Sequence, residues 1–297
     1  MPDPDLDALH VRLDALRAAL VAEYGWTHLA LRSTPTRDHE GRLRATLELA
    51  TLALAPRVRA LLHDLPCTLV LQPLPVRSWH ALLAPCTPVL RHHPALARSE
   101  LSTELQRDDG PVALVWREGE HALVRARDAT QGWIRDPLGP PCPARPLARP
   151  RLPPDPAAAL LAAARSYLGT PYRLGGATHA RIDCSALVQR AFVEALDVLL
   201  PKNSNDQLAA IGSDPAAPIE PGDLLFIHSR RERRTHVGLA GERDTVVQAS
   251  RSRSAVVEIP RDEYMADAAS LTRVSLARVL AWAAAQAGKP ALELPPR

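Results

Sequence analysis

Cysteine is scarce in this chain, and its few copies are scattered. The 297 residues include four cysteines, none of them in a CxxC pair: Cys67, Cys86, Cys142 and Cys184. This spacing argues against a disulfide framework or a zinc knuckle, so the simplest expectation is a cytoplasmic protein with reduced thiols. The pair His92-His93 has no partner at metal-binding spacing. We therefore expect neither a metal site nor a cofactor.

Long hydrophobic runs and strong charge are also missing. No apolar run is long enough to span a membrane. The acidic start, Met1-Pro2-Asp3-Pro4-Asp5, is not followed by the apolar core of a signal peptide, which again favours the cytoplasm and leaves only a non-classical export route open. A net charge of +3 is too small to indicate a nucleic-acid partner. Aromatic residues make up only 4%, so the core must be mostly aliphatic.

The first 76 residues have the pattern of a small α+β module. Leucines at helical spacing predict a helix over residues 5–23, and the following patterns predict strands at 26–31, 42–54 and 67–71 with a helix at 55–65. No chemical motif is present in this region. A docking role and a passive structural role both remain open for it.

Short strands separated by turns follow in residues 77–140. We expect an irregular lead-in over 77–95, then strands at 99–105, 112–117, 122–127 and 131–134, which together predict a small all-β barrel. Three segments resemble a bacterial SH3-like domain: Glu104-Leu105, Leu123-Val124-Arg125-Ala126 and Gly132-Trp133-Ile134. The alternative is a barrel that acts only as a spacer. Nine prolines between residues 136 and 156 then predict a stiff linker, assigned to residues 141–155.

Residues 156–287 have the pattern of a second α+β domain, followed by a flexible tail at 288–297. Asp155-Pro156 is typical of a helix start, and that helix ends before Gly169. A second helix follows Asp183, its expected cap. Strands are expected at 224–227, 235–240, 245–249, 255–259 and 274–279. Helices followed by a meander of strands form a layered α+β arrangement.

Three side chains in this domain have the chemistry of a nucleophilic site. Cys184 begins a helix, where the helix dipole favours a thiolate; the alternative is a buried structural cysteine. If the hairpin of 235–249 turns at Glu242, His236 lies opposite Gln248 on one face. A thiol, a base and a polar group that orients the base are the three parts that nucleophilic catalysis needs.

Five segments, in order, resemble the NlpC/p60 superfamily of papain-like cysteine peptidases. They are Gly169-Thr170-Pro171-Tyr172-Arg173-Leu174-Gly175-Gly176, Asp183-Cys184-Ser185-Ala186-Leu187-Val188, Leu200-Pro201-Lys202-Asn203-Ser204, Pro221-Gly222-Asp223-Leu224-Leu225-Phe226 and His236-Val237-Gly238-Leu239. The resemblance implies a papain-like fold, with Cys184 as nucleophile, His236 as general base and Gln248 as the orienting residue. It also implies that Tyr172 lines the cleft and the oxyanion site.

The resemblance further implies the substrate. Members of this superfamily cleave bacterial cell-wall peptides, commonly at the γ-D-glutamyl–diamino acid bond, and those with a preceding SH3-like domain tend to require a free N-terminal L-alanine. Asp183 and Ser185 are then expected to contact that end of the peptide. We therefore expect a cysteine endopeptidase that acts on muropeptides in cell-wall recycling. The alternatives are a non-catalytic peptidoglycan-binding or scaffold protein, and an amidase or acyltransferase with the same triad.

Overall fold

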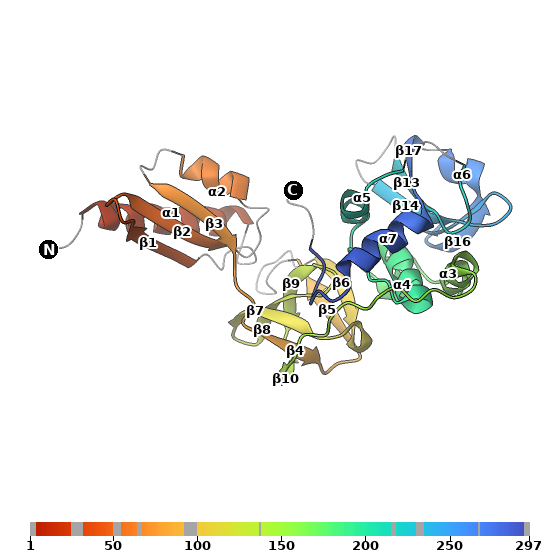
Figure 1. Cartoon of the computed structure of the whole chain (residues 1–297), viewed down its shortest axis with the longest axis horizontal. Coiled ribbons are helices and arrows are strands. Elements are labelled where there is room, and N and C mark those ends of the chain that lie inside the picture. Colours follow the sequence, from red (N-terminus) through yellow and green to blue (C-terminus); the bar gives the residue numbers. More distant parts are fainter. Residues whose placement is uncertain are drawn as a thin grey trace.

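The computed structural model describes residues 4–24, 32–49, 55–63, 67–91, 100–136, 138–214, 218–229, 235–266 and 268–293 (Figure 1). They form an N-terminal module, a central sheet and a C-terminal α+β domain in mixed α+β architecture. The central sheet lies between the other two parts in Figure 1. Within the described ranges, no helix has the length and apolar character needed to cross a membrane.

The N-terminal module is a three-stranded sheet with helices packed on it. Its elements are α1 (Pro4–Tyr24), β1 (Arg32–Arg37), β2 (Leu43–Leu49), α2 (Ala55–Leu61) and β3 (Thr68–Pro73). Strand β2 pairs antiparallel with β1 and parallel with β3. Leucines from α1 and β2 form its buried core with Val58. Both expected helices are confirmed; the strand expected at 26–31 lies outside the described residues, and β1 was not expected because its polar sequence is that of an edge strand.

The central sheet has seven strands in the order β10-β4-β7-β8-β9-β5-β6. Their bounds are β4 (Ser78–Leu82), β5 (Cys86–Leu90), β6 (Leu101–Gln106), β7 (Val112–Glu118), β8 (His121–Arg125), β9 (Gln131–Arg135) and β10 (Leu138–Cys142). A short 3-10 helix, Arg107–Asp109, follows β6. The outermost strands β10 and β6 do not pair with each other. The described strands therefore do not close into the expected barrel.

Two expectations for this region were wrong, and proline explains both. Residues 77–95 were expected to be irregular but contain β4 and β5, and β10 lies in the proline-rich stretch. Strand β10 is an edge strand paired only with β4, and edges tolerate prolines because they need fewer backbone donors. Strand β5 pairs with β9 only at Leu90 and is otherwise paired on one side only, with β6. The missing backbone N–H of Pro88 is therefore tolerated in this strand.

The C-terminal domain packs helices against a five-stranded antiparallel sheet of order β16-β15-β14-β13-β17. Its helices are α3 (Pro156–Arg165), α4 (Cys184–Leu196), α5 (Ser204–Ile211), α6 (Arg261–Met265) and α7 (Leu276–Gln286). Its strands are β11 (Ala177–Thr178), β12 (Arg181–Ile182), β13 (Leu224–Ser229), β14 (Thr235–Ala240), β15 (Thr245–Ser250), β16 (Ala255–Pro260) and β17 (Ala268–Val274). Helix α4 lies between α3 and strands β14 and β15, and nearly all of its residues are buried.

The capping residues of this domain explain where its helices begin. Asp155 accepts a hydrogen bond from the backbone of Ala158 at the start of α3, as expected. Ser275 does the same for Arg278 and starts α7 where a strand was expected over 274–279. That expectation was wrong because the apolar residues after the cap recur at helical spacing; the fifth strand is β17.

The middle of the linker and residues 288–292 are tied to the rest of the fold. The backbone of Leu147 donates to Lys289 and accepts from Gly288, both at 2.8–2.9 Å, and the backbone of Leu292 donates to Arg127 at 2.8 Å. Residues 288–293 of the expected flexible tail are therefore bonded to the linker and to the central sheet.

Candidate active site

Cys184 is the first residue of α4 and is partly exposed in a cleft. Asp183 is the N-cap, and its carboxylate accepts a hydrogen bond of 2.8 Å from the backbone of Ala186. The backbone N–H groups in the first turn of a helix have no partners within the helix. The thiol therefore lies where the helix dipole favours a negative charge.

His236 and Gln248 meet, but through a different register from the expected one. Strands β14 and β15 pair Leu239 with Val247 and Ala240 with Val246, so the hairpin is centred one residue later than Glu242. Continuing this register moves the partner of His236 by two residues, which keeps Gln248 on the same face. The side chains then reach each other diagonally, and His236 Nε2 lies 2.5 Å from Gln248 Oε1.

The imidazole of His236 is held between Gln248 and the Cys184 sulfur. Burial alone would lower the pKa of His236, but the charge of Cys184, a hydrogen bond with Cys184 and the bond to Gln248 outweigh it, so the net pKa is raised. Since Nε2 faces Gln248, Nδ1 is the nitrogen available to the sulfur. A raised imidazole pKa beside a thiol favours the thiolate–imidazolium pair.

Tyr264, a residue that sequence analysis missed, packs beside His236. Its ring centroid lies 5.7 Å from that of the imidazole, and its buried hydroxyl donates to the carbonyl of Leu225 at 2.7 Å. Gly238 makes room for this ring, because a Cβ at that position would lie 3.3 Å from Tyr264 and 2.6 Å from Val246. Nothing in the local sequence of α6 indicates this long-range contact.

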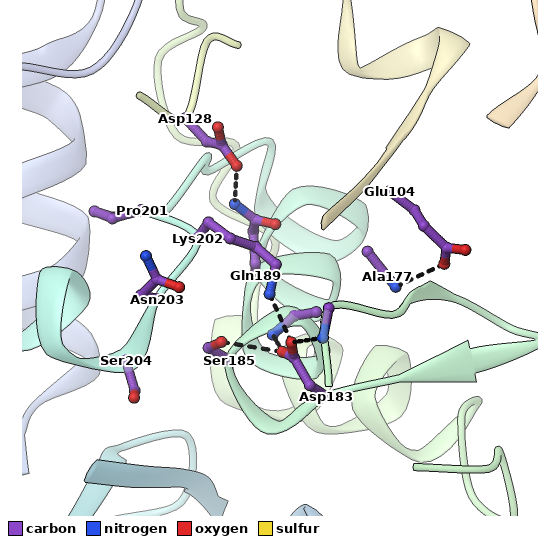
Figure 2. Close-up of polar contacts among 12 residues, drawn as sticks. Glu104, Asp128, Ala177, Asp183, Ser185, Gln189, Pro201, Lys202, Asn203 and Ser204 are labelled. Atoms are coloured by element: carbon purple, nitrogen blue, oxygen red, sulfur yellow. Dashed lines mark hydrogen bonds and ion pairs between the residues drawn. The ribbon is translucent and has the colours of Figure 1, made fainter. Parts of the chain in front are cut away.

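Asp183 is surrounded by donors from its own chain (Figure 2). Its Oδ1 accepts from Ala186 and from the Ser185 hydroxyl at 3.0 Å, and its Oδ2 accepts from the backbone of Gly175 and from Lys202 Nζ, each at 2.8 Å. The side chains of Lys202 and Asp183 are 3% and 4% exposed. Asp183 is thus a helix cap and half of a buried ion pair.

A second missed residue, Gln207, strengthens the same corner. Its side chain is fully buried, and its Nε2 donates to the carbonyls of Pro201 and Ser185 at 2.9 and 3.1 Å. Together with Lys202, it ties the segment after α4 to the first turn of that helix. The sequence pointed to Lys202, which lies in one of the five family-like segments, but it did not indicate that Lys202 pairs with Asp183.

The cleft has a volume of about 820 Å³ and contains every expected site residue. Cys184, His236 and Gln248 line it, as do Tyr172, Asp183 and Ser185. Other polar lining residues are Asn203, Ser204, Asn205, Thr235, Ser250 and Ser252. In the part of the chain that the structure describes, no cluster of three His, Cys, Asp or Glu side chains is suited to a metal ion.

The central sheet is fastened to this domain close to the site. Glu104 of β6 is almost fully buried and accepts from Arg181 and from the backbone of Ala177. Asp128 accepts from Gln189 of α4 at 3.0 Å; Figure 2 draws this bond and the bond from Ala177 to Glu104. Helix α4 is therefore held by the central sheet as well as by its own domain.

Comparison with known proteins identifies the domain that contains the cleft. Residues 169–274 match the NlpC/P60 family. The chain carries an NlpC/P60 domain. It is 34% identical over 121 residues to a gamma-DL-glutamyl hydrolase of Bacillus subtilis, covering 38% of this chain and 29% of that protein. It is 33% identical over 98 residues to a murein DD-endopeptidase/LD-carboxypeptidase, MepS, of Escherichia coli, covering 33% and 52%.

The match to these relatives is limited to part of their length, about half of MepS and less than a third of the Bacillus hydrolase. Among solved structures, the NlpC/p60 domain of the peptidoglycan hydrolase SagA is similar, at 25% identity over 40% of this chain and 98% of that chain, with a TM-score of 0.35.

Proposed function

We propose that this protein is a cysteine peptidase that hydrolyses peptides of the bacterial cell wall. The observation that carries the proposal is the imidazole of His236, held by Gln248 on one side and by the Cys184 sulfur on the other. This is the arrangement of nucleophile, base and orienting group that acyl transfer needs. The names of the relatives, a gamma-DL-glutamyl hydrolase and a murein endopeptidase, support the class of substrate.

The chemistry follows from these positions. The Cys184 thiolate attacks the carbonyl carbon, and the first turn of α4, with Tyr172 beside it, stabilises the oxyanion. The His236 imidazolium donates its Nδ1 proton to the leaving amine, which leaves a thioester on Cys184. Water then attacks the thioester while His236 accepts its proton, and the acid product leaves. Gln248 accepts from Nε2–H throughout, so the ring keeps one tautomer and one orientation.

The finer proposal concerns the bond and the parts of the fold that recognise the peptide. We assign cleavage to the γ-D-glutamyl–diamino acid bond of muropeptides, with the central sheet acting as an SH3-like wall of the cleft. The structure sets a requirement for the prediction that Asp183 binds the free amine of an N-terminal L-alanine. Because four donors already occupy its carboxylate, a substrate ammonium must replace one of them. Ser185 is bound to the same carboxylate.

Turnover of L-Ala-γ-D-Glu-diamino acid peptides tests this proposal. Cys184→Ala should abolish cleavage, whereas Cys142→Ala, which removes another partly exposed thiol, should leave it unchanged. Mass spectrometry of the products identifies the bond that is cut and separates hydrolysis from acyl transfer. Equal turnover by Cys184→Ala and the wild type would refute the proposal, and peptidoglycan binding without any cleavage would favour the scaffold alternative.

A further inference from the structure

The charged side chains that line the cleft differ in whether they already form ion pairs within the protein. Among the described residues, three arginines and two carboxylates line it: Arg91, Arg251, Arg253, Asp183 and Glu263. Both carboxylates are already paired, Asp183 with Lys202 and Glu263 with Arg253. The acidic groups of the cleft are therefore neutralised within the protein. Arg253 is used in one of these pairs, which directs attention to Arg91 as a group that a substrate can bind.

Among the described residues, Arg91 is the lining residue that comes from the region of the central sheet. It directly follows β5, and its backbone N–H donates to the carbonyl of Glu100 at 2.8 Å. Its side chain is exposed, and within the described ranges it is in no ion pair. The guanidinium is thus available to a ligand in the cleft.

The position of Arg91 is fixed by contact between the sheet and the loop before the nucleophile. Gly175 has a left-handed φ of +81°, and a Cβ there would lie 2.9 Å from the carbonyl oxygen of Leu101 in β6. Gln106 of the same strand donates to the carbonyl of Ala177 at 3.0 Å. Strand β6 therefore lies against the segment that leads to Cys184. The residue beside its start, Arg91, is held at the rim of the cleft.

We propose that Arg91 is a specificity residue that binds a carboxylate next to the scissile amide of the substrate. This inference rests on the proposed function. A γ-glutamyl linkage leaves the α-carboxylate of the glutamyl residue free, close to the carbonyl that the thiolate attacks. The diamino acid on the other side of the bond carries a carboxylate as well. Arginine matches either group, because its planar guanidinium donates two parallel hydrogen bonds to a carboxylate.

Three peptides distinguish the two carboxylates. The first is L-Ala-γ-D-Glu-diamino acid, the second has the glutamyl α-carboxylate as an amide, and the third has the diamino acid carboxylate as an amide. Wild-type protein should have a KM about 10-fold lower for the first peptide than for whichever amide removes the group that Arg91 binds, as expected for a hydrogen bond to a charged partner.

Arg91→Gln should raise the KM of the first peptide about 10-fold with kcat unchanged, and so remove the preference over that amide. Arg91→Lys should retain part of the preference. The control is Arg135→Gln, which removes an exposed arginine of the same sheet and should change nothing. The assignment is overturned if Arg91→Gln raises the KM of all three peptides by the same factor. It is also overturned if Arg91→Gln leaves every KM unchanged, as Arg135→Gln should.

Binding separates this inference from the proposed function. If the wild type cuts none of the peptides, calorimetric affinities are measured in Cys184→Ala and in Cys184→Ala/Arg91→Gln. A carboxylate preference that Arg91→Gln abolishes supports the inference even though peptidase activity has failed. Equal affinity for the acid and both amides refutes it.

Discussion

Replacing Lys202 by methionine removes one charge from the most buried ion pair of the described residues. The two side chains are 3% and 4% exposed, and Lys202 Nζ lies 2.8 Å from Asp183 Oδ2. Methionine keeps most of the apolar stem, so the change is chiefly electrostatic. Removing one partner of a buried ion pair costs about 3–5 kcal/mol, because the other charge is left uncompensated.

Three other donors remain on Asp183 after this change, from Gly175, Ser185 and Ala186. We therefore expect a loss near the lower end of that range, about 3 kcal/mol. A unit of 150–250 residues loses about 2–4 °C in Tm for each kcal/mol. The central sheet and the C-terminal domain together are of this size, so the expected fall in their joint Tm is about 6–12 °C.

Thermal unfolding followed by circular dichroism and calorimetry measures this effect. Lys289→Met is the matched control, because its pair with Glu293 is exposed and should be worth about 1 kcal/mol or less. The double variant Lys202→Met/Asp183→Asn should recover part of the loss, since the amide is neutral. If Lys202→Met lowers Tm no more than Lys289→Met, the buried pair does not hold the start of α4 and this reasoning is wrong.

Three further predictions concern Cys184, Gln248 and the central sheet. Cys184→Ala should lower the pKa of His236, because burial remains while the contributions of Cys184 are lost; an NMR titration showing an equal or higher pKa contradicts this. Gln248→Ala should also lower that pKa, move the basic limb of kcat/KM to lower pH and reduce kcat/KM about 10- to 100-fold; an unmoved basic limb would argue against the orienting role. Glu104→Gln should lower Tm by several degrees, because it weakens the buried pair with Arg181. Glu120→Gln, at an exposed pair, should change Tm by close to zero. Similar shifts in Tm for the two variants would mean that the pair of Glu104 with Arg181 adds no stability.

The elements that carry the site were predictable because their signals are local. The cap before Cys184 is confirmed by the bond from Ala186 to Asp183, and the cap at Asp155 by the bond from Ala158. Caps, proline at a first helical turn and apolar periodicity all act within a few residues. Such signals locate the start of a helix whatever surrounds it.

The contact between His236 and Gln248 was predicted through a wrong register. The hairpin turns one residue later than expected, at Arg243 and Asp244, which both have left-handed φ values of 53° and 63°. Moving the centre by one residue shifts the partner by two, so the face is preserved. Had the pairing slipped by one residue, the two side chains would have been on opposite faces. The sequence predicted correctly that His236 and Gln248 lie on the same face of the sheet, but it did not predict the conformation of the turn between their strands.

The supports of the site were not predictable because they join distant segments. Tyr264 reaches His236 from α6, and Glu104 reaches Arg181 from another sheet. Neither contact has a periodic or a short-range signal. The edge strand β10 was missed for a related reason: its prolines disfavour a strand in general, and only its place at the edge of a finished sheet makes them acceptable.

Asp183 shows how an unpredicted partner changes the meaning of a predicted residue. Without a neighbouring cation, a carboxylate beside the nucleophile is a natural site for a substrate ammonium. Lys202 already supplies that cation from inside the protein, and a charge that is paired and buried attracts little else. The charge that the cleft presents to a peptide then comes from Arg91. Recognition of a carboxylate near the scissile bond follows from this balance, and the amide peptides test it directly.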